Sequence, residues 1–384
     1  MANYRNDTAP NVGAPYTGVA PVSTTSSGTI PQSLVLKSWA KKTWETGIKE
    51  SYFSKFMGRD AKSIIHIKEE LSRGRGTSIN IPLLMPLTGA GVIEDNLLEG
   101  NEESLVYRDF DVPLSRIRHA VRLAGRFEEQ KTQMHLREDA RSALSEWLSW
   151  YVDSSIFAIL TGTEPAFING RTIKEPSPAN AVFPFEIEEP SLNRVICGGD
   201  ATVQSTFTGT VNGISAPDHF GVDLISKAKR LARADETTAI RPIRVDGRET
   251  YVMVIDQWQA RDLKGEEKWI KAQELANIRG EKNPIFSGAI GIWDGVVIHE
   301  CNRVPRTKNN KNVMVSHALF LGAQACVFAE GEAPRWVEKS FDYENQYGVS
   351  VGRMFGLKKS QFKFDGTNWT DFGVINVLTS SIED

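Results

Sequence analysis

His299, Glu300 and Cys301 follow one another directly and are of the types that bind metal ions or carry protons. Zinc deaminases combine a His-x-Glu sequence with a later Cys-x-x-Cys pair. Here the histidine and the glutamate are adjacent, and the sequence contains no Cys-x-x-Cys pair. In a strand, His299 and Cys301 would share one face and Glu300 would lie on the other. We therefore predict a packed strand at this position and no metal site.

A second segment, Gly352 to Ser360, resembles a phosphate-binding loop because two glycines are followed by Lys358 and Lys359. The P-loop pattern requires four residues between its glycines and a lysine directly after the second one. Here only three residues lie between the glycines, and a leucine follows Gly356. Since the flanking residues alternate as in a strand, the segment does not indicate nucleotide binding.

Residues for nucleophilic or acid–base catalysis are also missing. The sequence has no Gly-x-Ser-x-Gly elbow, and its six histidines are scattered without a recognisable nucleophile beside them. The neighbouring acids Glu102 and Glu103 could act as a general acid and base, but they lie in a glycine-rich stretch that is typical of a solvated loop. We therefore expect no enzyme activity, no catalytic residues and no cofactor.

A basic run precedes the longest predicted helix. Its five cationic or titratable residues are Arg116, Arg118, His119, Arg122 and Arg126. Such a run could contact the phosphate groups of a nucleic acid, or it could pair with acidic side chains such as those of residues 94–103. The whole chain carries a net charge of −3, and no aromatic residues alternate with the arginines to stack on bases. We favour pairing with acidic groups.

The elements that position these residues belong to a globular chain of 384 residues, which is long for one domain and suggests two packed lobes. Hydrophobic residues make up 40% of the chain and charged residues 24%. The cysteines, Cys197, Cys301 and Cys326, are too sparse for a disulfide framework, so we expect reduced thiols in a cytoplasm. No signal peptide and no run near the roughly 20 apolar residues of a membrane helix is present, so we expect no membrane partner.

Residues 1–33 have the composition of a tail. They are rich in Thr, Ser, Pro, Gly and Ala, and only Arg5 and Asp7 are charged. Such a stretch cannot bury enough apolar surface to offset the entropy of ordering it. We expect it to become ordered only against a partner surface, through apolar residues that include Tyr4, Tyr16 and Ile30.

A long two-stranded arm is predicted next. Residues 78–85 and 105–114 alternate in polarity with strand period, and the stretch between them is rich in glycine and acidic residues. Because an isolated hairpin is only marginally stable in water, the arm needs a surface of its own chain or of a neighbour. Glu99, Glu102 and Glu103 at its tip lack a cationic residue at hairpin distance. We therefore expect them to meet Arg or Lys of another copy.

The strongest single element is a helix over residues 126–161, which contain no Gly and no Pro and show helix period. Gly162 is well placed to end it. Residues 163–215 are predicted to form a long loop. Helices are predicted over 216–234, 257–264 and 266–278. Strands are predicted over 250–255, 295–299, 314–320, 326–329, 336–341, 347–355 and 372–378.

Eight short stretches together resemble one family. They are Lys37 to Trp39, Tyr52 to Gly58, Pro82 to Gly91, Leu98 to Glu103, Arg118 to Arg122, Ala140 to Trp147, Phe328 to Gly331 and Phe341 to Gly348. They resemble the major capsid proteins of podoviruses related to phage N4, most closely over residues 34–162 and less so over 315–356. The segment from Pro82 to Glu103, which contains two of these stretches, is the most specific part of the resemblance.

The resemblance implies an α+β capsid fold of the Hong Kong 97 phage type, with an N-terminal arm, an extended β-hairpin loop, a long spine helix, and peripheral and axial domains. In the implied division, residues 1–33 form the N-terminal arm, 34–63 the start of the peripheral domain and 64–125 the extended loop. Residues 126–215 form more of the peripheral domain, with spine helix 127–161 and a loop insertion. Residues 216–330 form the axial domain, and residues 331–384 return to the peripheral domain. The contacts expected between subunits involve Glu99, Glu102, Glu103, Arg116, Arg118, Arg122, Tyr4, Tyr16 and Ile30.

The resemblance also implies a function. The chain would assemble with itself into hexamers and pentamers of an icosahedral shell that encloses double-stranded DNA, bound without sequence specificity. Its location would be the virion capsid, after assembly in the cytoplasm of a host bacterium. Expected partners are a separate scaffolding protein, a portal and, as a further candidate, a decoration protein. A scaffold fused to the chain is not expected, because only about 33 residues precede the folded region.

Two other classes of protein compete with this interpretation. A tail-tube or decoration protein would also lack an active site, but a long helix that follows a long hairpin favours a capsid subunit. A nucleic-acid-binding module would require a basic chain, which the net charge of −3 opposes.

Overall fold

The computed structural model describes most of the chain after residue 50. The described residues are 51–70, 76–163, 184–275 and 288–382, apart from 86, 88, 90, 95, 132–135, 235–237, 246–247 and 365–366. The predictions for residues 1–33, with Tyr4, Tyr16 and Ile30, and for residues 34–50 lie outside this range. Within it, no helix combines the length and the apolar character that crossing a bilayer requires.

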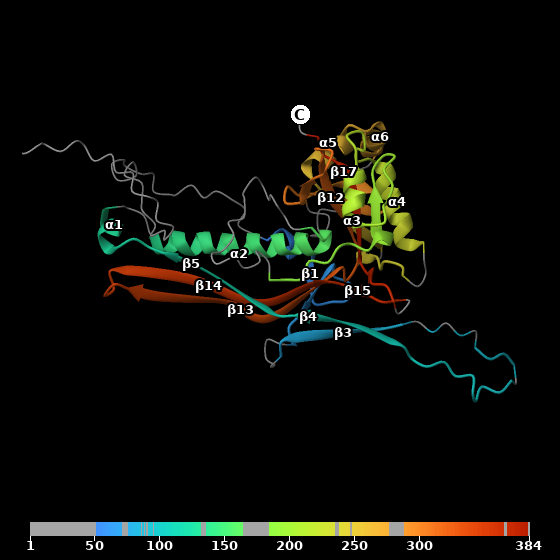
Figure 1. Ribbon diagram of the computed structural model, residues 1–384, viewed down its shortest axis with the longest axis horizontal. Helices are drawn as coiled ribbons and strands as arrows, with labels where there is room; N and C mark the ends of the chain where they lie inside the picture. Colours follow the sequence, from blue (N-terminus) through green and yellow to red (C-terminus); the bar gives the residue numbers. More distant parts are fainter. Residues whose placement is uncertain are drawn as a thin grey trace, which may run out of the picture.

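One lobe is a five-stranded sheet with a long helix along one face (Figure 1). Its strands, in spatial order, are β1 (Met57–Gly58), β2 (Ile65–Lys68), β13 (Cys326–Phe341), β14 (Gln346–Lys359) and β5 (Ser115–Arg122). The helix is α2 (Leu136–Thr161), and the short helices α1 (Arg126–Lys131) and η2 (Tyr52–Phe56) lie beside its two ends (Figure 1).

The predicted spine helix is present as α1 and α2, with residues 132–135 between them outside the described range. The 26 residues of α2 span about 39 Å. Gly162 ends the helix as predicted, with φ +66°. A Cβ atom there would lie 2.5 Å from Cδ of Pro190 and 2.6 Å from the carbonyl oxygen of Glu188. Glycine is therefore required at this position both by backbone conformation and by space.

The predicted arm is a hairpin of β3 (Ser78–Leu84) and β4 (Tyr107–Pro113), and the segment between them extends well beyond the rest of the molecule (Figure 1). The predicted alternation is confirmed. Ile79, Phe110 and Val112 are buried, and their immediate neighbours in β3 and β4 are exposed. This buried face packs on Phe362 and Phe372. The base of the arm is therefore fixed to the body of the subunit, whereas its tip is not.

The second lobe contains an eight-stranded sheet. Its main path is β6 (Val195–Cys197), β17 (Val374–Ser380), β12 (Met314–Leu321), β8 (Arg248–Ile255), β10 (Val296–Glu300) and β9 (Ala289–Trp293), with β7 (Ile243–Val245) on β8 and β11 (Arg306–Lys308) on β12. The helices of this lobe are η4 (Leu192–Arg194), α3 (Phe207–Gly213), α4 (Val222–Arg233), α5 (Gln257–Lys264) and α6 (Glu267–Leu275). A small separate sheet pairs β15 (Gln361–Phe362) with β16 (Thr370–Asp371).

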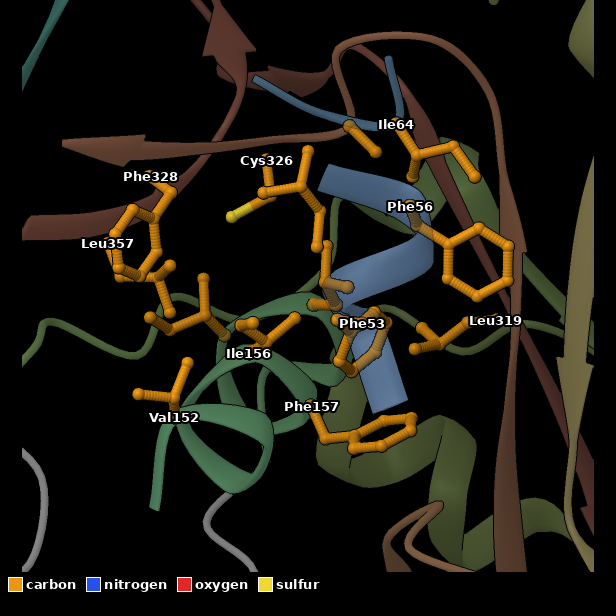
Figure 2. Close-up of a cluster of buried hydrophobic side chains, with 14 of the residues drawn as sticks. Phe53, Phe56, Ile64, Val152, Ile156, Phe157, Leu319, Cys326, Phe328 and Leu357 are labelled. Atoms are coloured by element: carbon orange, nitrogen blue, oxygen red, sulfur yellow. The ribbon is translucent and has the colours of Figure 1, made fainter. Parts of the chain in front are cut away.

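A single hydrophobic core joins the two lobes (Figure 2). Phe53 of η2 is fully buried and packs on Phe157 of α2, with ring centroids 4.7 Å apart. Leu319 of the eight-stranded sheet and Phe328 of the five-stranded sheet belong to the same cluster. Because side chains from both sheets and from α2 pack together, the relative position of the lobes is set by close packing.

The α+β class expected from the sequence is confirmed, but the strands divide between the lobes differently from the expected boundaries. β17, expected in the returning peripheral segment, lies between β6 and β12 in the eight-stranded sheet. β2 and β5, expected in the extended loop, pair with β13 and β14. The boundary at residue 331 falls inside β13. Alternation predicts a strand, but pairing across long sequence separations is not visible in it.

Residues 163–215 also differ from the long loop that was expected. Their described part contains η4, β6 and α3. The strand β6 has three residues and the helix α3 has seven, with Gly209 and Gly213 among them. Elements of this length are too short to produce a periodic pattern. The side chain of Thr206 caps α3 by accepting a hydrogen bond from the Gly209 backbone N–H, which is the one local signal of this helix.

Candidate surfaces for contacts between subunits

The arginines of β5 lie on the face of the five-stranded sheet that is turned away from α2. Ile117 is buried and His119 stacks on Trp147 of α2 with ring centroids 4.5 Å apart, so the odd-numbered residues of β5 face the helix. Alternate residues of a strand point to opposite faces, which places Arg116 and Arg118 on the outer face, where they are exposed. Burial lowers the pKa of His119. The basic run therefore does not form one cluster.

The strand register adds two cationic residues to this outer face. Arg118 lies opposite Gly352 of β14, and Gly352 lies opposite Arg335 of β13. Gly348 is in the same way opposite both Arg122 and Lys339. Directly opposed residues of antiparallel strands share a face. The exposed residues that result, here called the basic strip, are Arg116, Arg118, Arg122, Arg335 and Lys339.

Small residues form the floor of the basic strip. A Cβ atom on Gly352 would lie 3.0 Å from Cγ of Arg118, so the arginine stem lies across this glycine. Phe341 covers Gly348 in the same way. The guanidinium of Arg122 stacks on the Phe341 ring at 4.7 Å and its Nε donates a 2.8 Å hydrogen bond to Oε1 of Gln346. Arg122 is thereby held in position.

Acidic partners for the basic strip are scarce within the subunit. Glu332 is 4.0 Å from Arg335, and both side chains are exposed by more than a third. Among the described residues, neither Arg116 nor Arg118 forms an ion pair. The strip is therefore a positively charged surface of the isolated subunit. From the sequence we favoured pairing of these arginines with acidic groups. Within the described part of one copy, Arg116 and Arg118 do not make such a pair.

The acidic residues of the arm tip lie at the opposite end of the molecule from α1 and the adjoining end of β5 (Figure 1). Glu103 accepts a 2.6 Å hydrogen bond from the Gly89 backbone N–H across the arm, and Glu102 accepts one of 2.8 Å from Gly100 N–H. Glu99 is exposed. These bonds shape the tip of the arm.

The arm also exposes apolar side chains. Their exposed fractions lie between 42 and 72%, and they are Leu84, Leu87, Ile93, Leu97, Leu98, Leu105, Val106 and Tyr107. Single exposed apolar residues are ordinary on a protein surface, but a series along one projecting segment marks an interaction site. The arm thus combines negative charge with apolar surface, which is complementary to the charge of the basic strip.

The segments that resembled chemical sites are structural. His299 is fully buried in β10, where its Nδ1 lies 3.3 Å from Nζ of Lys55, and burial raises the pKa of the Cys301 thiol to about 12. Glu300 faces outward as predicted. In the part of the chain that the structure describes, no three His, Cys, Asp or Glu side chains are grouped as metal ligands. Gly352 to Lys359 lies in β14, so the segment is a strand and not a loop before a helix.

Arg335 and Lys339 were missed from the sequence. The strand predicted over residues 336–341 includes Lys339 but not Arg335, and the proximity of both residues to β5 depends on the register of β13, β14 and β5. Conversely, Arg126 belongs to α1 and not to the strip. Its backbone N–H donates to the Asn345 carbonyl at 3.0 Å, and its Nη2 donates to the Tyr347 hydroxyl at 2.9 Å, which lowers the pKa of Tyr347.

Comparison with known proteins identifies what this arrangement is similar to. The model of a family described as phage capsid protein matches residues 25–383. The chain is 33% identical over 357 residues to a major capsid protein of Pseudomonas phage KPP25, covering 89% of this chain and 94% of that protein.

Solved structures agree with the sequence comparison. The capsid of Ralstonia phage GP4 superposes with a TM-score of 0.77 at 26% identity, over 98% of this chain and 99% of that one. A subunit from the capsid of cyanophage Pam1 superposes with a TM-score of 0.71 at 20% identity, over 93% and 99% of the two chains, which supports the fold. The finer resemblance to podoviruses related to phage N4 stays a prediction.

Proposed function

The chain belongs to the phage capsid protein family and is a major capsid protein, and from this premise we propose that it assembles with itself into hexamers and pentamers of an icosahedral shell around double-stranded DNA. Its place is the virion capsid, and we propose assembly in the cytoplasm of the host bacterium. The subunit acts as a structural element without catalysis and without a cofactor. A separate scaffolding protein, a portal and a decoration protein are proposed partners.

The observation that carries the proposal is the complementarity between the arm and the basic strip. The arm presents Glu99, Glu102 and Glu103 among exposed apolar residues and projects away from its own subunit (Figure 1). The strip presents five exposed cationic residues on a floor of Gly348, Ser350 and Gly352. We propose that the arm of one copy lies on the basic strip of the next.

Such a contact joins two different surfaces, so it is heterologous and repeats from copy to copy until a ring closes. Each exposed ion pair contributes only about 0–1 kcal/mol, and burial of the apolar arm residues adds about 25 cal/mol for each Å² removed from water. No single contact needs to be strong, because a closed shell repeats every contact many times.

Substitution of the two surfaces separately and together tests the proposal. In the triple variant Glu99→Gln, Glu102→Gln, Glu103→Gln, the amide oxygens can still accept the backbone hydrogen bonds while the charge is lost. We expect a several-fold lower yield of shells by negative-stain microscopy and light scattering, and a weaker response of the remaining shells to salt. The triple variant Arg116→Gln, Arg118→Gln, Arg335→Gln should reproduce both effects.

The combination of the two triple variants distinguishes their roles. If arm and strip contact each other, the variant with all six substitutions should lose little more shell yield than either triple variant, because the same interaction is removed in all three. Additive losses would show that the surfaces act on different partners. If the arginines instead contact packaged DNA, the strip variant should form shells of normal yield that fail to fill. The exposed pair Lys271 and Glu267, 3.2 Å apart, provides a control for the loss of surface charge.

The predicted tail contacts at Tyr4, Tyr16 and Ile30 complete the proposed set of contacts between subunits. They rest on composition alone, since these residues lie outside the described range.

A further inference from the structure

The loop at the tip of the β13–β14 hairpin has an unusual backbone. Asp342, Tyr343 and Glu344 have φ values of +51°, +48° and +68°. Non-glycine residues adopt this left-handed region at a cost, because their Cβ atoms approach the backbone closely. Three in succession, one of them aromatic, are therefore an unfavourable choice for a turn that glycine or asparagine could make. Backbone strain that persists in a folded protein is frequently found where it serves a function.

The strained loop presents Tyr343 entirely to solvent. Its exposed fraction is 104%, whereas the other tyrosine of the hairpin, Tyr347, is half-buried beneath the guanidinium of Arg137 at 3.8 Å from the ring centroid. Asp342 and Glu344 on either side are also exposed. Nothing in the described part of the subunit contacts the Tyr343 ring, so its apolar surface is buried by a partner or not at all.

The loop is nevertheless held firmly. Asn345 closes it through a 2.9 Å hydrogen bond from its N–H to the Asp342 carbonyl and one of 3.1 Å from its side-chain amide to the Asp342 carboxylate. The start of α1 fixes it from outside, since the Arg126 N–H donates to the Asn345 carbonyl at 3.0 Å and the Arg126 guanidinium lies 3.8 Å from Glu344. An aromatic side chain on a fixed backbone loses little entropy when it becomes buried.

We propose that Tyr343 is an anchor that inserts into an apolar depression on a second copy of this chain and joins one ring of subunits to another. Tyrosine is among the residue types that most often dominate the binding free energy of protein interfaces. The hairpin tip and the arm lie at opposite ends of the subunit (Figure 1). Since an arm-to-strip contact closes rings, a shell requires at least one further contact between rings. This inference rests on the proposed function as a shell subunit.

The variant Tyr343→Gly distinguishes a role of the side chain in contacts between subunits from a role in the stability of the subunit. Glycine adopts positive φ without strain, so the unassembled subunit should unfold at an equal or higher denaturant concentration than wild type. The yield of closed shells should nevertheless fall at least five-fold, with rings still present by native mass measurement. Tyr343→Phe should retain shells. Asn312→Gly replaces another residue of positive φ (+63°) in an exposed turn and should leave shell yield unchanged.

Chemical modification gives a second measurement on the unaltered protein. Tetranitromethane should nitrate Tyr343 about tenfold more slowly in shells than in unassembled subunits, as measured by mass spectrometry of peptides. Equal nitration in both forms, or shells of Tyr343→Gly at wild-type yield, would overturn the inference while leaving the proposed function intact. Wild-type protein that forms no shells under any assembly condition would instead contradict the proposed function itself.

Discussion

Arg303 and Asp153 form a buried ion pair between the two lobes, with side-chain exposures of 4 and 0%. Asp153 belongs to α2, and Arg303 follows β10 of the eight-stranded sheet. The same carboxylate accepts hydrogen bonds from the Ser51 hydroxyl at 2.5 Å and the Tyr52 N–H at 2.8 Å. One side chain of α2 thus binds the segment before β1 and the segment that follows β10 together.

Replacement of Asp153 by Asn should destabilise the subunit by about 3–5 kcal/mol, because the Arg303 charge is then buried without a counter-charge. Urea unfolding of the unassembled subunit measures this loss. The double variant Asp153→Leu, Arg303→Met removes both charges and should lose less than Asp153→Asn alone. An Asp153→Asn variant within about 0.5 kcal/mol of wild type would show that the pair does not hold the lobes together.

His317 of β12 should make the subunit sensitive to mild acid. It is fully buried, its Nε2 lies 2.8 Å from the Thr307 hydroxyl, its Nδ1 has no hydrogen-bond partner among the described residues, and burial lowers its pKa from 6.5 to about 4. Between pH 6.5 and 4 the unfolded chain binds a proton that the folded chain does not, so stability falls as pH falls through this window.

The loss attributable to His317 is about 3 kcal/mol between pH 6.5 and 4, with no further loss below the folded-state pKa. Urea unfolding at a series of pH values measures it. In His317→Gln, which cannot take up this proton, the pH dependence over the same window should be reduced by that amount. An identical pH profile in the variant would exclude His317 as its source.

Gly162→Ala should shorten or distort the end of α2. Alanine would be strained at φ +66°, and its methyl group would meet Pro190 and the Glu188 carbonyl. We expect a loss of about 2 kcal/mol or more in the free energy of unfolding. Gly100→Ala is the matched control, since Gly100 has φ +92° but nothing within 4 Å of a Cβ atom. A smaller loss at Gly162 than at Gly100 would contradict the steric argument.

Deletion of residues 2–30 should leave a soluble subunit with an unchanged circular dichroism spectrum per folded residue, because this stretch lacks the composition to form a core. Closed shells should become rarer or disappear, since the tail is proposed to lie along another subunit. Electron microscopy reports the shells. Truncated protein that builds shells of normal size and heat resistance would show that the tail is not an assembly arm.

Features with a short-range cause were predictable from the sequence. The helix predicted over residues 257–264 is α5 with the same bounds, because Asp256 caps it and the Gln259 side chain accepts a 3.0 Å hydrogen bond from the Asp256 N–H. The alternation of β3 and β4 and the end of α2 at Gly162 are also local. The order of a tail, a long hairpin, a long helix and a second lobe also followed from the sequence, and the resemblance to capsid proteins implied the capsid fold that unites them.

Features that depend on pairing of distant segments were not predictable. The five residues of the basic strip come together only through the register of β5, β14 and β13, so the sequence indicated three of them and misgrouped His119 with the arginines. The position of β17 within the eight-stranded sheet has the same origin. The backbone strain at Tyr343 likewise arises from the closed hairpin, and the amino-acid types of the loop do not indicate it.

The pairing of β5 with β14 has a mechanical consequence. β5 continues from the arm at one end of the subunit, and β14 begins at the hairpin tip at the other end (Figure 1). If neighbours pull on these two ends, the antiparallel strands are drawn in opposite directions along their length, and the ladder from Ser115–Phe355 to Arg122–Gly348 is loaded in shear. In shear all hydrogen bonds of the ladder share the force and must break together, whereas unzipping breaks them one at a time. The β5–β14 ladder therefore suits the subunit to bear tension within the wall of a shell.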